Sequence, residues 1–80
     1  MGYHIRKIKK GVIGDVSKIR EELEELEDAI EQKCRIMASV ELSDLYGAIE
    51  EFAKRFGLSM EDLETMSDIT KRAFKDGSRK

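Results

Sequence analysis

Two pairs of acidic residues have the spacing that places carboxylates on one face of a helix. Glu22 and Glu25 lie three residues apart in the acidic run EELEELEDAI, and Glu41 and Asp44 lie three apart in VELSDLYGAI. Residues at i and i+3 leave the same side of an α-helix. If the two helices pack antiparallel, the four carboxylates converge between them. All-oxygen ligands of this kind suit Mg²⁺ or Mn²⁺, in octahedral sites completed by water and phosphate. One interpretation is therefore a divalent metal site.

The alternative is that these carboxylates pair with basic side chains or face water. Glu41 and Asp44 fall within the apolar stripe that contains Met37, Val40 and Leu45, so we expect both to be buried. Burying an unpaired carboxylate is costly, and such groups need a cation or a wet cavity. The lysines and arginines of both segments lie near the expected helix ends. A salt bridge at the level of the four carboxylates is therefore not expected, and the metal interpretation gains weight.

The elements that would position these residues are helices. We expect an all-α fold of one domain, residues 1–80, with a basic arm over 1–14, extended or a short strand, and helices over 15–33, 35–56 and 60–76. A helical hairpin plus a third helix would complete a four-helix-type bundle by oligomerisation. The chain has 80 residues and one cysteine, Cys34, so no internal disulfide is possible. A small core then depends on a metal or on self-association.

Local signals define the ends and the inner faces of these helices. Asp15 or Ser17 can cap the first helix, and Ser59 with Asp62 forms a weak capping box at the third. Gly47 lies within the second helix and would permit close helix approach, for example across a dimer. The first helix has an apolar stripe that we expect to face the core: Ile19, Leu23, Leu26 and Ile30.

Charge is distributed unevenly along the chain. Residues 1–20 carry a net charge of +5, residues 21–68 of −11, and residues 69–80 of +4. A DNA-binding protein more often has a basic stripe through its main helix, so nucleic acid is not an expected partner. The sequence contains no run of ~18 apolar residues that could span a membrane and no hydrophobic signal region. The expectation is a cytoplasmic protein without membrane association.

The two acidic motifs together resemble the signature of the MazG-like, all-α nucleoside triphosphate pyrophosphohydrolases. That signature is EExxE followed, after a gap of variable length, by ExxD. Here EELEE, residues 21–25, is followed after fifteen residues by ELSD, residues 41–44. The C-terminal TKRAFKDGSR, residues 70–79, is similar to the ending of small, phage-type members. The resemblance covers about Gly11 to Arg79.

The resemblance implies a fold, a reaction and a set of ligands. Members form tight dimers or dimers of dimers and cleave a nucleoside triphosphate between its α- and β-phosphates, giving the monophosphate and pyrophosphate. It implies that Mg²⁺, with Mn²⁺ as a possible substitute, is held by four carboxylates and that Glu21 orients or deprotonates the attacking water. Glu21 is equally well explained as an exposed helix residue. The implied metal ligands are Glu22, Glu25, Glu41 and Asp44.

Basic residues near both ends are candidates for binding the substrate phosphates. We expect contacts from Lys71, Arg72 and Arg79, and a further one from Lys18 just before the acidic run. The alternative for a basic last turn is simple complementation of the helix dipole. Phe74 is the best candidate for stacking on a base, although a core or dimer contact is the plainer interpretation. Neither His4, expected at the surface, nor Cys34 is expected to be catalytic.

The chain is shorter than many relatives, which carry further helices around the nucleobase. Either a second subunit completes the pocket, or catalysis is weak or lost. A non-catalytic helical interaction or regulatory module, whose acidic faces bind a basic partner, is the second hypothesis. A purely structural coiled coil is a third, and acidic residues inside the stripe argue against it.

Overall fold

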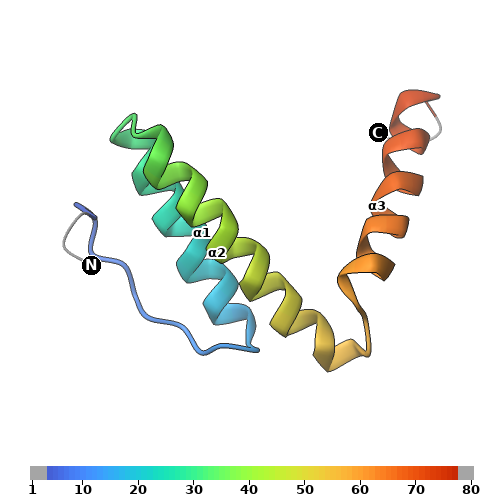
Figure 1. Cartoon of the computed structure of the whole chain (residues 1–80), viewed down its shortest axis with the longest axis horizontal. Helices are drawn as coiled ribbons and strands as arrows, with labels where there is room; N and C mark the ends of the chain where they lie inside the picture. Colours follow the sequence, from blue (N-terminus) through green and yellow to red (C-terminus); the bar gives the residue numbers. More distant parts are fainter. Residues whose placement is uncertain (1–3, 78–80) are drawn as a thin grey trace.

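The computed structural model describes residues 4–77, and over this range it is entirely helical, with no strand. The helices are α1 (Val16–Glu31), α2 (Arg35–Ala53) and α3 (Met60–Lys75), with a short 3₁₀ helix, η1 (Lys54–Phe56), continuing α2. The expected all-α class is therefore confirmed. Residues 4–15 precede α1 without regular secondary structure and run beside the hairpin (Figure 1).

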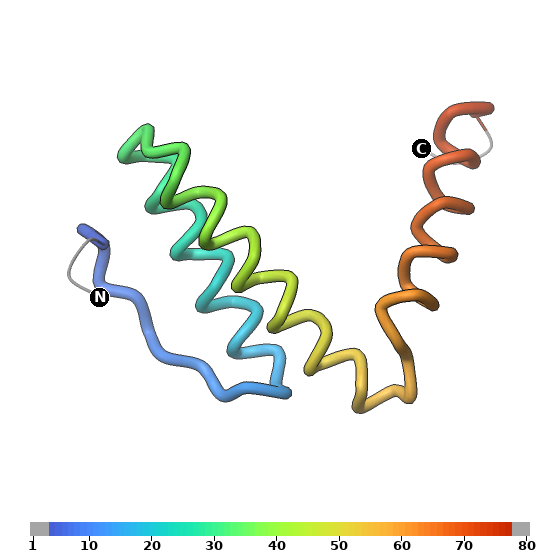
Figure 2. The backbone as a smooth tube through the Cα atoms, in the orientation of Figure 1, coloured from blue at the N-terminus to red at the C-terminus, as the bar shows by residue number. Residues whose placement is uncertain are grey.

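Helices α1 and α2 form an antiparallel hairpin joined by a tight turn (Figures 1 and 2). Asp15 caps α1, since its carboxylate accepts a hydrogen bond from the Ser17 amide at 3.1 Å. At the other end the chain reverses at Lys33, whose φ of 55° lies in the left-handed region. The Cys34 amide then donates to the Ala29 carbonyl at 3.2 Å, which closes the helix end. The hairpin brings the two acidic motifs face to face.

Helix α3 diverges from the hairpin (Figure 1). Gly57, with a φ of 69°, ends η1 in a conformation that favours glycine, and Ser59 begins α3 with the expected capping box. The Ser59 hydroxyl accepts from the Asp62 amide at 3.1 Å, and the Asp62 carboxylate accepts from the Ser59 amide at 2.9 Å. Among the described residues α3 does not pack along α1 or α2, and none of its own residues is buried.

The contact between α1 and α2 is made by small side chains and carboxylates. Within residues 4–77 the buried apolar residues are three alanines, Ala29, Ala48 and Ala53. Their small volumes leave room for longer polar side chains in the same layer. The largest fully buried side chains are Glu41 and Asp28.

The apolar stripe of α1 is only partly covered, so the expectation that it faces the core was wrong for Leu23 and Ile30. The other two residues of the stripe are half-buried. Leu23 is 45% exposed and Ile30 is 61% exposed. Two elements, α2 and the arm, already cover the acidic side of α1, which turns part of its apolar side outwards. On the rest of the chain Val40, Tyr46 and Phe74 are also exposed. A single copy therefore leaves apolar surface on all three main helices.

The arm is attached to the acidic side of α1. The Arg6 guanidinium pairs with Glu31 and, at 3.4 Å, with Glu27. The backbone amides of Ile5 and Arg6 both donate to the Asp28 carboxylate, each at 3.3 Å.

Over the described range, no helix is long and apolar enough to cross a membrane.

Candidate metal centre

The four predicted ligands meet at the α1–α2 interface. One oxygen from each of Glu22, Glu41 and Asp44 can be chosen so that all three lie within 4.8 Å of one another. Glu25 lies in two adjoining sets of the same kind, one with Glu22 and one with Glu41. The spacing i, i+3 and the antiparallel hairpin together explain this convergence, because each helix presents two carboxylates towards the other.

The cluster is buried at one end and open at the other. Glu41 is 0% exposed and Glu22 is 4% exposed, whereas Asp44 is exposed. The expectation that Asp44 would be buried was therefore wrong. A hollow of about 420 Å³ opens over the cluster and is lined by residues that include Lys18, Glu22, Glu25 and Asp44. A phosphate group or water could reach the carboxylates from this side.

The carboxylates repel one another strongly enough to change their protonation. Burial, the hydrogen bond with Glu21 and the charges of Glu22 and Glu41 raise the pKa of Glu25 to about 7. Burial also raises the pKa of Glu22, despite the nearby Lys18 ammonium. Asp44 is exposed as a residue, yet partial desolvation of its carboxyl group and the neighbouring Glu41 raise its pKa. The cluster thus holds more negative charge than its surroundings neutralise, and a divalent cation would relieve that excess.

Glu21 lies beside these ligands in a different environment. Its side chain is 2% exposed, so the interpretation of Glu21 as an exposed helix residue was wrong. Its carboxylate accepts from the Gly11 amide at 2.8 Å and from the Lys18 ammonium at 3.2 Å. Although burial opposes ionisation, the hydrogen bonds from Gly11 and Glu25 and the Lys18 charge lower the pKa of Glu21 to about 2. A carboxylate with so low a pKa is a weak proton acceptor and is better suited to orienting a water molecule.

His4 lies inside the acidic cluster, which corrects the expectation of a surface histidine. Its Nε2 atom is 3.2 Å from Glu25 Oε1 and 3.0 Å from Glu41 Oε2. Its Nδ1 atom is 2.7 Å from Asp28 Oδ2. Burial disfavours the charged imidazole, but the hydrogen bond to Asp28 and the charges of Glu25 and Glu41 raise the pKa of His4. The arm thus supplies a nitrogen group at the level of the carboxylates, and Lys18 on α1 supplies a second one. The expectation that no salt bridge would form at this level was therefore wrong.

Asp28 is a site residue that sequence reasoning missed. It is 0% exposed and accepts hydrogen bonds from four groups, including the His4 imidazole and the Gln32 side-chain amide at 2.8 Å. These donors lower the pKa of Asp28 against the opposing effect of burial. A signal was present in the sequence, because Asp28 continues the i, i+3 series of Glu22 and Glu25 on the same helix face.

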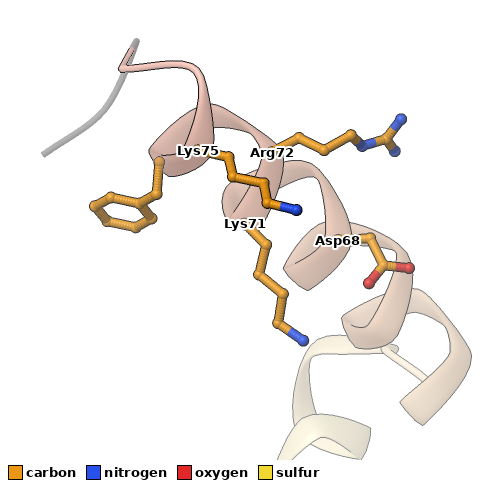
Figure 3. Close-up of a pocket in the computed structure, with 5 residues that line it drawn as sticks. Asp68, Lys71, Arg72 and Lys75 are labelled. Atoms are coloured by element: carbon orange, nitrogen blue, oxygen red, sulfur yellow. The ribbon is translucent and has the colours of Figure 1, made fainter.

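The predicted phosphate ligands fall into two separate groups. Lys18 lies at the cluster, with its ammonium 3.2 Å from Glu21 and 3.7 Å from Glu22. Lys71 and Arg72 instead project from α3, together with Lys75 and Asp68 (Figure 3). Because α3 diverges from the hairpin, one copy of the chain does not bring these side chains to the carboxylates (Figure 1). Arg79 lies outside the described residues.

A second hollow, of about 760 Å³, lies on α3 and not at the carboxylates. It is lined by Lys71, Arg72, Phe74 and two neighbours on the same helix. One helix cannot enclose a ligand, so this surface is a concave face rather than a cavity. Phe74, the predicted base-stacking residue, is 50% exposed there.

Comparisons with protein-family models, with curated proteins and with solved structures find no match to this chain. The resemblance to MazG-like enzymes therefore rests on the two acidic motifs and the C-terminal motif alone.

Proposed function

We propose that this protein is a Mg²⁺-dependent nucleoside triphosphate pyrophosphohydrolase, of the MazG-like type, that releases a monophosphate and pyrophosphate. The metal ligands in this proposal are Glu22, Glu25, Glu41 and Asp44. The observation that carries it is their convergence on two facing helices, with Glu22, Glu41 and Asp44 within 4.8 Å of one another. Oxygen donors with an open side match the needs of Mg²⁺, which keeps part of its water shell and binds substrate phosphates.

The chemistry follows from this arrangement. Bound Mg²⁺ would polarise the phosphate oxygens and favour an in-line attack by water. Lys18, at the rim of the cluster, would stabilise negative charge on the phosphates. Glu21, held ionised by Gly11 and Lys18, would orient the attacking water through an oxygen lone pair. The open side at Asp44 gives the triphosphate a route to the metal.

Self-association is part of the proposal, as a homodimer or homotetramer. Exposed apolar side chains on α1, α2 and α3 would be covered by a second copy, which would complete a helical bundle. A second copy could also bring the basic face of α3, with Lys71 and Arg72, to the carboxylates of the first. The same packing would place Phe74 near the base. Arg79, seven residues after Arg72 in the sequence, is a further phosphate contact in this proposal.

The test is pyrophosphate release from a panel of ribo- and deoxyribonucleoside triphosphates, with and without Mg²⁺ or Mn²⁺. Asp44→Asn is the variant of choice, because Asp44 is exposed and its substitution should leave the hairpin folded. Glu64→Gln, on the exposed side of α3, is the matched control. Cation-dependent release that Asp44→Asn abolishes and Glu64→Gln retains is the expected result. No release from any nucleotide with either cation would refute the enzymatic function.

A second candidate is a non-catalytic interaction module that keeps the acidic faces. It is favoured by His4 and Lys18, which already place nitrogen groups against the carboxylates. A basic protein partner would bind without a divalent cation, and its affinity would fall as salt is added. The enzyme would instead require the cation.

A further inference from the structure

We propose that His4 is itself a metal ligand, positioned by Asp28, so that the centre is a mixed nitrogen and oxygen site. Such a site would prefer a divalent transition metal such as Mn²⁺ or Co²⁺ over Mg²⁺. The inference rests on the metal centre of the proposed function and changes its ligand set and its metal. Its core is His4, Glu25 and Glu41, one of the three groups of converging donor atoms among residues 4–77.

The distances at Nε2 are those of neighbouring ligands. His4 Nε2 lies 3.2 Å from Glu25 Oε1 and 3.0 Å from Glu41 Oε2. Two donor atoms at right angles around an ion with bonds of about 2.1 Å are separated by about 3.0 Å. The imidazole therefore has the spacing of an adjacent ligand to each of the two carboxylates, and all three donor atoms lie within 4.8 Å of one another. The His4 side chain is 11% exposed and that of Glu41 is 0% exposed, so little bulk water competes at this end.

Asp28 gives the imidazole the orientation that a ligand requires. The Nδ1 atom of His4 lies 2.7 Å from Asp28 Oδ2, which assigns a proton to Nδ1 and directs Nε2 into the cluster. Metal-binding histidines almost always donate their other ring N–H to such a partner, and a carboxylate is a common one. The Asp28 carboxylate is held in place by the Ile5 and Arg6 amides and the Gln32 side chain. It is therefore a positioning residue.

The arm that carries His4 is fixed on both sides of the cluster. Next to His4, the Arg6 guanidinium pairs with Glu27 and Glu31. Farther along, the Gly11 amide donates to Glu21 at 2.8 Å. A ligand held this way loses little conformational freedom when it binds metal, which favours ligation over a loosely placed counter-ion.

The competing interpretation is that His4 is an imidazolium that only neutralises Glu25 and Glu41. In that case Nε2 keeps its proton when a metal ion binds to the carboxylates, and the ring does not coordinate the ion. Nε2 coordinates the metal ion in the first interpretation and does not coordinate it in the second. Detecting whether bound metal contacts this nitrogen therefore distinguishes them. Imidazole is a better ligand for first-row transition metals than for Mg²⁺, which favours oxygen. A metal that couples to the imidazole nitrogen is therefore the informative probe.

The experiment is Mn²⁺ binding to the full chain without nucleotide, followed by pulsed EPR for hyperfine coupling to an imidazole nitrogen. The wild-type protein should bind Mn²⁺ and show the coupling. His4→Gln should remove it and weaken Mn²⁺ binding by about tenfold or more, with a change of less than about threefold for Mg²⁺. Arg6→Gln is the matched control, since it weakens the same arm and leaves the imidazole in place. It should keep the coupling, and circular dichroism would establish that both variants are folded.

Three outcomes would overturn the inference, and they separate it from the proposed function. Mn²⁺ bound to wild type without nitrogen coupling would exclude His4 as a ligand and leave the four-carboxylate site standing. Equal losses of Mn²⁺ and Mg²⁺ affinity in His4→Gln and Arg6→Gln would mean that docking of the arm matters, rather than ligation. Failure of wild type to bind either ion would refute both this inference and the proposed metal-dependent activity.

Discussion

Replacing Glu25 by glutamine should stabilise the metal-free protein at pH 8 and remove most of its response to divalent cations. In the wild type, burial and the neighbouring carboxylates raise the pKa of Glu25 from 4.5 to about 7. The folded state therefore binds more protons than the unfolded state between these values. Stability contributed by the protonated group is fully present below pH 4.5 and is lost as the pH rises through about 7. Glutamine resembles the protonated form at every pH.

The magnitude follows from the size of the shift. A difference of about 2.5 pKa units corresponds to roughly 3 kcal/mol between the two protonation states. The Glu25 side chain is only 13% exposed, so solvent screening reduces this value little. His4 acts in the same direction, because its raised pKa means that its contribution to stability is also lost as the pH rises. The metal-free wild type should therefore be several kcal/mol less stable at pH 8 than at pH 5.

The assay is urea unfolding followed by circular dichroism, at pH 5 and pH 8, with a chelator. One protein concentration is used throughout, so that the proposed self-association contributes equally to every sample. Glu25→Gln should match wild type at pH 5 and exceed it by about 2–3 kcal/mol at pH 8. Added Mg²⁺ or Mn²⁺ should restore the wild type at pH 8 and have little effect on the variant. Glu64→Gln serves as the control for removal of a surface carboxylate.

Two results would refute this reasoning. One is a wild-type stability that stays constant or rises between pH 5 and pH 8 in the absence of metal. The other is a Glu25→Gln variant that is less stable than wild type at pH 8. Either would mean that the carboxylates do not repel one another as their positions imply.

Three further substitutions test the arm, α2 and α3. Gly11→Ala should displace the arm, because an added Cβ would lie 2.3 Å from the Ser17 carbonyl oxygen, and we expect lower thermal stability and weaker Mn²⁺ binding by titration. Gly47→Ala is the control, because an added Cβ at this position would meet no atom within 4 Å. It should leave thermal stability unchanged or raise it by up to about 1 kcal/mol. An equal loss of stability in the Gly11 and Gly47 variants would contradict the role of Gly11. Arg72→Gln should raise the KM for the triphosphate roughly tenfold through loss of a charged hydrogen bond, with Mn²⁺ affinity unchanged. Unchanged KM would mean that the basic face of α3 does not contact substrate.

Most of the helical architecture could be predicted because its signals are local. The Asp15 cap, the capping box at Ser59 and Asp62, and the stop at Gly57 each depend on a few neighbouring residues, and the structure contains all of them. The direction in which α1 turns its apolar stripe could not be predicted in this way. It depends on what lies across the chain, and Leu23 is exposed because the arm and α2 take the acidic face.

The candidate site likewise has one part that local sequence signals predict and one part that depends on long-range contacts. The convergence of Glu22 with Glu41 and Asp44 needs only helix periodicity and a reversal of the chain, so sequence spacing was sufficient to predict it. The position of His4 needs contacts with Asp28 and Glu41, which lie 24 and 37 residues away, and no local pattern encodes them. The sequence contains one indication of the contact with Asp28. Asp28 lies three residues after Glu25 and therefore shares the helix face of Glu22 and Glu25.

The two basic segments of the chain have different surroundings in the structure. Both basic ends were expected to bind phosphate, but the first one pairs with the acidic helix α1 through His4, Arg6 and Lys18. Only the basic face of α3 lies away from that helix in a single copy. Phosphate recognition by Lys71 and Arg72 at the carboxylates would therefore depend on how copies associate. Dilution of the protein below the dissociation constant of the oligomer should then weaken triphosphate binding before it weakens metal binding. The reason is that each hairpin holds its own four carboxylates.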